Sequence, residues 1–306
     1  STLCSGASDW LRDGCVTEVG WVADLVNTEI PVGKMLCPSN PYSISATFND
    51  LLNANTAAFD SCVDRLGSGP KTKPDGSVVR NPCRVIIEDG LAPGSAARLA
   101  LVQSEVLEEF YNTNYTASWF LARTTVSLDN SGNLRQATAG CGADIRSRNS
   151  TIGPLTTRRV DSARASSSTI PLLGDGAPTA NLLQSIGEHD AGEMTVASFT
   201  RGPVLRTTMQ PPTFAAGTSR EGANGWWAVW NREVLQDYRQ FATVHRGSCN
   251  ILFADGGVRA LKDTNDDGLL NNGFPALAGS GFADDALEIM ASDCMSFYSL
   301  DVVELP

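Results

Sequence analysis

Residues 241–274 read FATVHRGSCNILFADGGVRALKDTNDDGLLNNGF, and this stretch decides the fold of the C-terminal half of the chain. Strand-forming residues over 248–254 and 258–262 flank Asp255-Gly256, a pair typical of a tight turn. Such a turn needs positive φ angles, which glycine adopts at no steric cost. The sequence therefore predicts an antiparallel β-hairpin at this place.

The register of this hairpin determines what His245 can do. With the turn at Asp255-Gly256, Cys249 lies opposite Lys262, and His245 and Asp255 lie at opposite ends of the hairpin. The extended chain between them spans on the order of 30 Å, whereas a catalytic dyad needs hydrogen-bond contact. We therefore expect His245 to pack or to anchor a loop rather than to act as a general base.

The return strand leads directly into an acidic loop with the spacing of a calcium ligand set. Oxygen-bearing side chains stand at the first, third and fifth positions of residues 263–271, and a glycine follows at the sixth. This alternation lets a tight loop wrap around a hard cation. We expect Leu270 to point into the core. The predicted calcium ligands are Asp263, Asn265, Asp267, the backbone carbonyl of Leu269, and Asn271.

One ligand of the complete EF-hand pattern is missing from this loop. Phe274 occupies the twelfth position, where a glutamate would bind the ion with both oxygens. We predict a partial, dockerin-like calcium loop that is completed by water or by a distant carboxylate, with Asp284 and Asp285 as candidates. The alternative is a solvated acidic turn, but the D-x-N-x-D-G spacing favours calcium.

Eight cysteines are spread widely along the chain, and none has the C-x-x-C spacing of zinc ribbons or redox dithiols. In an acidic chain this distribution is typical of disulfides formed in an oxidising compartment. Buried free thiols in a cytosolic protein are the alternative. The sequence does not choose among the pairings of the candidates, which are Cys4, Cys15, Cys37, Cys62, Cys83, Cys141, Cys249 and Cys294.

Helical patterns precede the strand-rich part of the chain. Apolar stripes at helical spacing predict a helix over 45–66 and another over 95–111, the second with Phe110 on its buried face. Later segments rich in Thr, Val, Phe and Trp alternate with turns, which is typical of antiparallel strands. We therefore expect an α+β fold, with helices packed on an antiparallel β-sheet with long loops. It would form a single domain over 1–306, helical over about 1–115 and strand- and loop-rich over about 116–306.

The charge of the chain argues against two classes of partner. Its 306 residues carry 23 Lys and Arg against 34 Asp and Glu, a formal net charge of −11. Phosphate binding depends on clustered basic side chains, so we expect neither nucleic acid nor an anionic membrane as a partner. No apolar run is long enough to span a bilayer. We expect an extracellular, cell-surface or periplasmic protein whose targeting segment lies outside this sequence.

Three stretches resemble a family of pilin-like proteins that is abundant in planctomycetes and their relatives. His245, nine intervening residues and then Asp255-Gly256 match the H-x9-D-G signature of this family. Residues 35–41, MLCPSNP, look like its "lCPSdP" stretch, and Ile170–Asp175 is weakly similar to its "itDGlSNT" segment. Members carry a prepilin-type cleavage/methylation leader before a domain of unknown function.

The resemblance implies an exported protein with a type IV pilin-like or pseudopilin-like architecture, and it implies no catalytic residues. The hydrophobic N-terminal helix that builds the filament core in this family is absent from this chain. We expect either that this helix was removed or that assembly uses globular faces alone. The expected partners are further copies of this chain or other pilin-like subunits.

Half of the tryptophans lie close together, at Trp226, Trp227 and Trp230. Core packing is the favoured interpretation, because large aromatic side chains dominate protein cores. A sugar-stacking platform and a subunit interface are the alternatives. Asn114-Tyr115-Thr116 and Asn149-Ser150-Thr151 are glycosylation sequons.

Catalytic motifs give little support to an enzyme. The chain has no G-x-S-x-G elbow, P-loop, H-E-x-x-H motif or Rossmann glycine pattern. We expect a non-enzymatic structural subunit of a surface filament, pilus or pseudopilus, stabilised by calcium and disulfides. Two alternatives stay open. One is a calcium-dependent glycan-binding or adhesion module that uses the tryptophan cluster, and the other is a secreted carboxylate hydrolase, which leaves no local motif.

Overall fold

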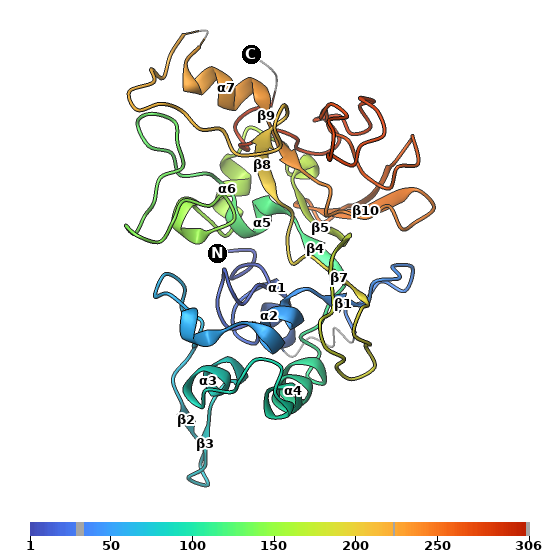
Figure 1. Cartoon of the computed structure of the whole chain (residues 1–306). Helices are drawn as coiled ribbons and strands as arrows, with labels where there is room; N and C mark the ends of the chain where they lie inside the picture. Colours follow the sequence, from blue (N-terminus) through green and yellow to red (C-terminus); the bar gives the residue numbers. More distant parts are fainter. Residues whose placement is uncertain (29–33, 223, 304–306) are drawn as a thin grey trace. The chain divides into compact units, whose positions relative to one another are not determined.

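The computed structural model describes residues 1–28, 34–222 and 224–303 (Figure 1). Where the sequence predicts one domain, the chain divides into two compact units. The helical unit comprises Cys4–Tyr115 and Pro178–Ser198, and the sheet unit comprises Ser1–Leu3, Thr116–Ala177 and Phe199–Pro306. The break after residue 115 lies where the sequence changes from helix-forming to strand-forming segments.

The helical unit combines short helices with two small sheets. In one sheet β1 (Ile44–Ser45) pairs in parallel with β7 (Met194–Val196), which pairs antiparallel with β6 (Pro178–Asn181). Strands β2 (Lys71–Thr72) and β3 (Val78–Val79) form a narrow hairpin, visible in Figure 1. The helices are α1 (Trp21–Val26), α2 (Thr47–Asn53), α3 (Pro82–Glu88) and α4 (Ala96–Val102), with a 3-10 turn at Thr56–Ala58 and a π turn at Gln103–Leu107.

The first predicted helix is shorter than its apolar stripe indicates, so the prediction over 45–66 is wrong in length. Helix α2 ends at Asn53. The last carbonyls of a helix lack intrahelical donors, and here the buried guanidinium of Arg98 donates to the carbonyls of Leu51 and Ala54 at 2.5 and 2.9 Å. A side chain distant in sequence therefore terminates the helix.

The second predicted helix forms but changes its pitch. Ser95 caps α4 by accepting a hydrogen bond from the Arg98 amide at 3.3 Å. The helix then continues as the π turn Gln103–Leu107, which adds one residue to a turn and rotates the later side chains. Phe110 is consequently 48% exposed, with φ of 67°, and its predicted burial is wrong.

The sheet unit contains a four-stranded sheet in the order β11–β10–β5–β4 and a separate antiparallel pair, β8–β9. The class predicted from sequence, α+β with antiparallel sheets, is confirmed. The strands are β4 (Tyr115–Ala117), β5 (Pro171–Asp175), β8 (Gly202–Leu205), β9 (Val234–Asp237), β10 (Ser248–Phe253) and β11 (Val258–Lys262). The helices are α5 (Trp119–Arg123), α6 (Thr157–Ser162) and α7 (Trp226–Glu233), with 3-10 turns at Arg148–Ser150 and Ser167–Thr169.

The predicted hairpin is present as β10 and β11, but its register differs by one residue. Cys249 pairs with Leu261, and Lys262 pairs with Ser248. The amide of Phe253 donates to the carbonyl of Gly257, which closes a three-residue loop in place of the expected two-residue turn. Gly256 has a φ of 82° in this loop, the left-handed conformation that such loops require.

The cysteines fall into two chemical states. Cys15 and Cys83 form a disulfide in the helical unit. Cys62 of the helical unit and Cys141 of the sheet unit are also disulfide-bonded. Cys249 and Cys294 are buried thiols in the sheet unit. Burial raises the pKa of Cys294 to about 12 and raises that of Cys249 as well, so both stay protonated and unreactive at neutral pH.

Within the described ranges, every helix is too short or too polar to cross a bilayer. The disulfide is compatible with an extracellular or periplasmic location.

Candidate functional site

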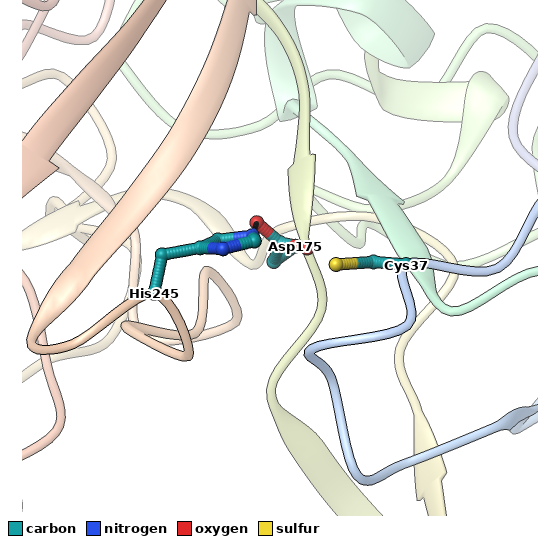
Figure 2. Close-up of side chains that lie close together, drawn as sticks. All are labelled: Cys37, Asp175 and His245. Atoms are coloured by element: carbon teal, nitrogen blue, oxygen red, sulfur yellow. Dashed lines mark ion pairs between the residues drawn. The ribbon is translucent and has the colours of Figure 1, made fainter.

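Three buried aspartates of the sheet unit differ in how the fold compensates their charge. Asp237 accepts two hydrogen bonds from the guanidinium of Arg239, at 2.7 and 2.9 Å. Asp175 faces His245, whose Nε2 lies 3.1 Å from Oδ2 of the carboxylate (Figure 2). Asp263 is 2% exposed, and no described Lys, Arg or His forms an ion pair with it. Of the three aspartates, it is the one without a basic side chain beside it.

Asp263 lies instead beside two further carboxylates. Ligand oxygens of Asp263, Asp267 and Glu288 all lie within 4.8 Å of one another. Oδ1 of Asp263 is buried and accepts no hydrogen bond. Like charges at this separation repel, and a buried polar atom without a partner costs about 1–3 kcal/mol or more. A cation bound among the three carboxylates would remove both costs.

Glu288 supplies the carboxylate that the loop itself lacks. Its Oε1 accepts a hydrogen bond from the amide of Thr264 at 2.6 Å, and its Oε2 accepts one from the amide of Asn271 at 2.9 Å. The structure thus brings Glu288 into the carboxylate cluster. Of the two sequence-based candidates, both exposed, Asp284 contacts the loop by accepting a hydrogen bond from Asn265 at 3.0 Å but lies outside the cluster, and Asp285 accepts one from the amide of Ala276.

Backbone amides also hold the two aspartates of the site. The Gly268 amide donates to Oδ2 of Asp263 at 2.8 Å, and the Leu269 amide donates to Oδ1 of Asp267 at 2.9 Å. Gly268 has a φ of 85°, which explains the glycine at the sixth position. Each carboxylate oxygen has more than one lone pair, so these amide donors leave capacity for a cation.

The remaining predicted ligands contribute to the loop itself. Oδ1 of Asn265 accepts a hydrogen bond from the amide of Asp267 at 3.1 Å. Asn271 is fully buried, and its Oδ1 accepts hydrogen bonds from two successive amides at 2.9 and 2.8 Å. Leu270 is fully buried in the core cluster of the sheet unit, as expected. The carboxylate cluster therefore consists of two predicted residues, Asp263 and Asp267, and of Glu288, which the sequence analysis did not predict.

The contact between His245 and Asp175 joins two of the segments that resemble pilin-like proteins. Asp255 lies in the hairpin loop, where its side chain accepts the Gly257 amide at 2.8 Å, away from His245. Asp175 ends β5, which pairs with β10 and lies in the stretch similar to "itDGlSNT". Neither carboxylate oxygen of Asp175 accepts a hydrogen bond, and a protonated His245 would neutralise this buried carboxylate.

The tryptophan cluster is divided between core and surface. Trp226 and Trp230 are 7% and 0% exposed, and their indole N–H groups donate to the carbonyls of Asn130 and Gly132 at 3.2 and 2.8 Å. Trp227 is 37% exposed. Core packing therefore accounts for two of the three rings, and Trp227 is available to a ligand.

The asparagines of both glycosylation sequons are buried and hydrogen-bonded to the backbone. Asn114 is 1% exposed, and its amide group exchanges two hydrogen bonds with the backbone of Cys37. Asn149 is 9% exposed and donates to the carbonyls of Thr138 and Gly142. A glycan on either nitrogen would break these contacts, so neither sequon is an acceptor in the folded chain.

Residues 156–268, a little over a third of the chain, match the sequence profile of a family described as "Protein of unknown function (DUF1559)". No curated protein and no solved structure matches the chain. The matched region includes the His245–Asp175 pair and the acidic loop through Gly268, whereas Glu288 lies beyond it. Over this region the chain is similar to a family whose function is not known.

Proposed function

We propose that this chain is an exported structural subunit of a surface filament, pilus or pseudopilus-like appendage, and that calcium stabilises it at Asp263, Asp267 and Glu288. One observation carries the calcium part, namely the buried, unpartnered oxygen of Asp263 among three carboxylates. The appendage part rests on the resemblance of the H-x9-D-G segment to pilin-like proteins.

The chemistry of the donors supports calcium over transition metals. The three acidic ligands offer oxygen only, which suits a hard cation, whereas zinc and copper sites usually include imidazole or thiolate. Calcium also accepts irregular ligand sets of six to eight oxygens, with water and carbonyl groups filling the remaining positions. Magnesium demands a nearly ideal octahedron and is the weaker fit to a loop of this kind.

The proposed ion has a mechanical role. Glu288 precedes Ile289, which packs in the same core cluster as Leu270 of the acidic loop. The amides of Glu288 and Ile289 both donate to the carbonyl of Asn271, at 2.8 and 3.0 Å. An ion that binds Glu288 together with Asp263 would therefore fix the two loops that cover this end of the core. A subunit that transmits tension in an appendage needs such fixed loops.

Electron microscopy tests the proposed function on native material from which the chain is purified. Ordered filaments that contain this subunit, and that loosen when EGTA removes calcium, would support the proposal. Magnesium at equal concentration serves as the control and should not restore the filaments. Dispersed particles with and without calcium would reject the appendage role, while calcium-dependent stability of the isolated chain would still be measurable on its own.

A further inference from the structure

A groove in the sheet unit gathers arginines in a chain that is otherwise acidic. It encloses about 570 Å³, within the range of ligand-binding sites. Three guanidinium groups line it, from Arg164, Arg220 and Arg232, against the carboxylates of Glu221 and Asp301. The groove thus has an excess of positive charge on a chain whose net charge is −11.

The two carboxylates are already engaged. Asp301 accepts two hydrogen bonds from Arg159, at 3.0 and 2.8 Å, and Glu221 lies 3.4 Å from Arg220. Arg164 and Arg232, by contrast, form no ion pair within the ranges that the structure describes. Their guanidinium groups are exposed and present planar sets of donors that match a carboxylate.

Tyr298 adds a hydroxyl to this groove. Its ring is 4% exposed and packs 5.1 Å from the ring of Trp230, which fixes its position. The hydroxyl has no hydrogen-bond partner among the described residues, although it belongs to the groove lining. Burial raises the pKa of Tyr298 to about 12, so at neutral pH the group is a proton donor. The Tyr298 hydroxyl is therefore a fixed donor that a ligand oxygen in the groove could accept.

Trp227 gives the groove an apolar surface. Its ring is 37% exposed, and the guanidinium of Arg220 lies 4.8 Å from the ring centroid. This contact holds Arg220 at the groove and leaves part of the indole uncovered. Aromatic rings of this kind pack against the C–H faces of sugar rings, because those faces are apolar while the hydroxyls point outward.

We propose that this groove binds a carboxylate-bearing saccharide, such as a uronic acid unit of an acidic polysaccharide. Arg164 and Arg232 bind the carboxylate, the Tyr298 hydroxyl donates to a ring or hydroxyl oxygen, and Trp227 packs against the sugar ring. An acidic peptide would use the arginines but has no need of the exposed indole. The site is separate from the acidic loop and does not depend on the proposed appendage role.

Calorimetric titration with a hyaluronan hexasaccharide tests the site on the full chain. The control ligand is the same oligosaccharide with its carboxyl groups reduced, which removes the charge and keeps the sugar rings. The variants are Arg164→Gln, Arg232→Gln, Trp227→Ala and Tyr298→Phe. Arg135→Gln is the control variant, because Arg135 is exposed in the same unit, lies outside the groove and changes the net charge equally.

We expect the acidic hexasaccharide to bind and its reduced form to bind at least about tenfold more weakly, as charge-assisted hydrogen bonds are lost. Each groove arginine variant and Trp227→Ala should weaken binding by about tenfold, Tyr298→Phe by about threefold, and Arg135→Gln by less than about twofold. Absence of binding, or binding that the groove variants leave unchanged, would overturn the proposal. Equal binding of poly-glutamate would overturn its saccharide part and indicate a general polyanion site.

Discussion

Arg98 in the helical unit and Asp263 in the sheet unit are both buried charged residues, but only Arg98 has a hydrogen-bond partner for every polar atom of its side chain. The Arg98 guanidinium donates to four backbone carbonyls, and its centre lies 5.6 Å from the ring of Trp10. Asp263 keeps one oxygen without a donor and has carboxylates as neighbours. The chain itself therefore satisfies the buried charged group of Arg98, whereas at Asp263 we propose that an ion from solution does so.

Removal of Arg98 should have the largest effect. Arg98→Met fills much of the same volume but leaves buried carbonyls of Leu51 and Ala54 without their donors. We expect the free energy of unfolding to fall by about 3–5 kcal/mol, equally in calcium and in EGTA. Urea denaturation in both buffers measures this. A loss below about 1 kcal/mol would show that these carbonyls find other partners and that the comparison with Asp263 does not hold.

Asp263→Asn should abolish the stabilisation by calcium. At calcium concentrations near 100 Kd, the wild type gains about 2.7 kcal/mol from the ion, and the variant should gain almost nothing. In EGTA the variant should be at least as stable as the wild type, because a buried uncompensated charge has been removed. Thermal unfolding in calcium and in EGTA gives both comparisons.

Asp266→Asn is the matched control for this variant. Asp266 is exposed in the same loop and adopts a φ of 58°, which asparagine tolerates well. It loses the same charge without touching the three-carboxylate cluster. A calcium response of Asp266→Asn as small as that of Asp263→Asn would mean that loop charge alone, and not a defined site, produces the effect.

Glu288→Gln tests whether Glu288, rather than Asp284, completes the calcium site of the acidic loop. Substitution of a residue that only hydrogen-bonds to a metal's ligands commonly lowers the affinity for the metal 10- to 100-fold. Loss of a charged ligand should therefore weaken calcium binding by about 100-fold. Asp284→Asn should change the affinity by less than about threefold, because Asp284 lies outside the cluster. A fluorescent calcium indicator used in competition measures both. If the two variants exchange these effects, the sequence-based choice of Asp284 was correct.

The smallest expected effect concerns an exposed pair in the helical unit. A hydrogen bond from Arg84 is the main cause that lowers the pKa of Glu88 below its ordinary value of 4.5. This lowered pKa contributes stability above pH 4.5, and the contribution is lost as the pH falls through the value in the folded state. Glu88→Gln should therefore be slightly less stable than the wild type at pH 6 and no less stable at pH 2. Melting curves between these pH values, insensitive to calcium, check the sign.

Local patterns predicted well wherever neighbouring residues determine the structure. Turn residues at Asp255-Gly256 located the hairpin, and the alternation from Asp263 to Asp267 located the acidic loop, because each depends on a few adjacent residues. The register error arose from the same turn, since two- and three-residue loops share a glycine with positive φ.

Contacts between distant segments account for what the sequence missed. Glu288 reaches the acidic loop, Asp175 reaches His245, and Arg98 ends α2, each from a segment far away in the chain. A single sequence carries no spacing signal for such contacts. The aspartate in Ile170–Asp175 was the one available hint, because it lies in a stretch that resembles the same family as the H-x9-D-G motif.

Isothermal titration of calcium into EGTA-treated, dialysed protein tests the central claim most directly, with Asp263→Asn measured alongside. We predict that one calcium ion binds per wild-type chain and that the heat of this binding disappears in Asp263→Asn. Absence of calcium binding to the wild type, or equal binding to the variant, would contradict the proposal that the buried oxygen of Asp263 is a calcium ligand.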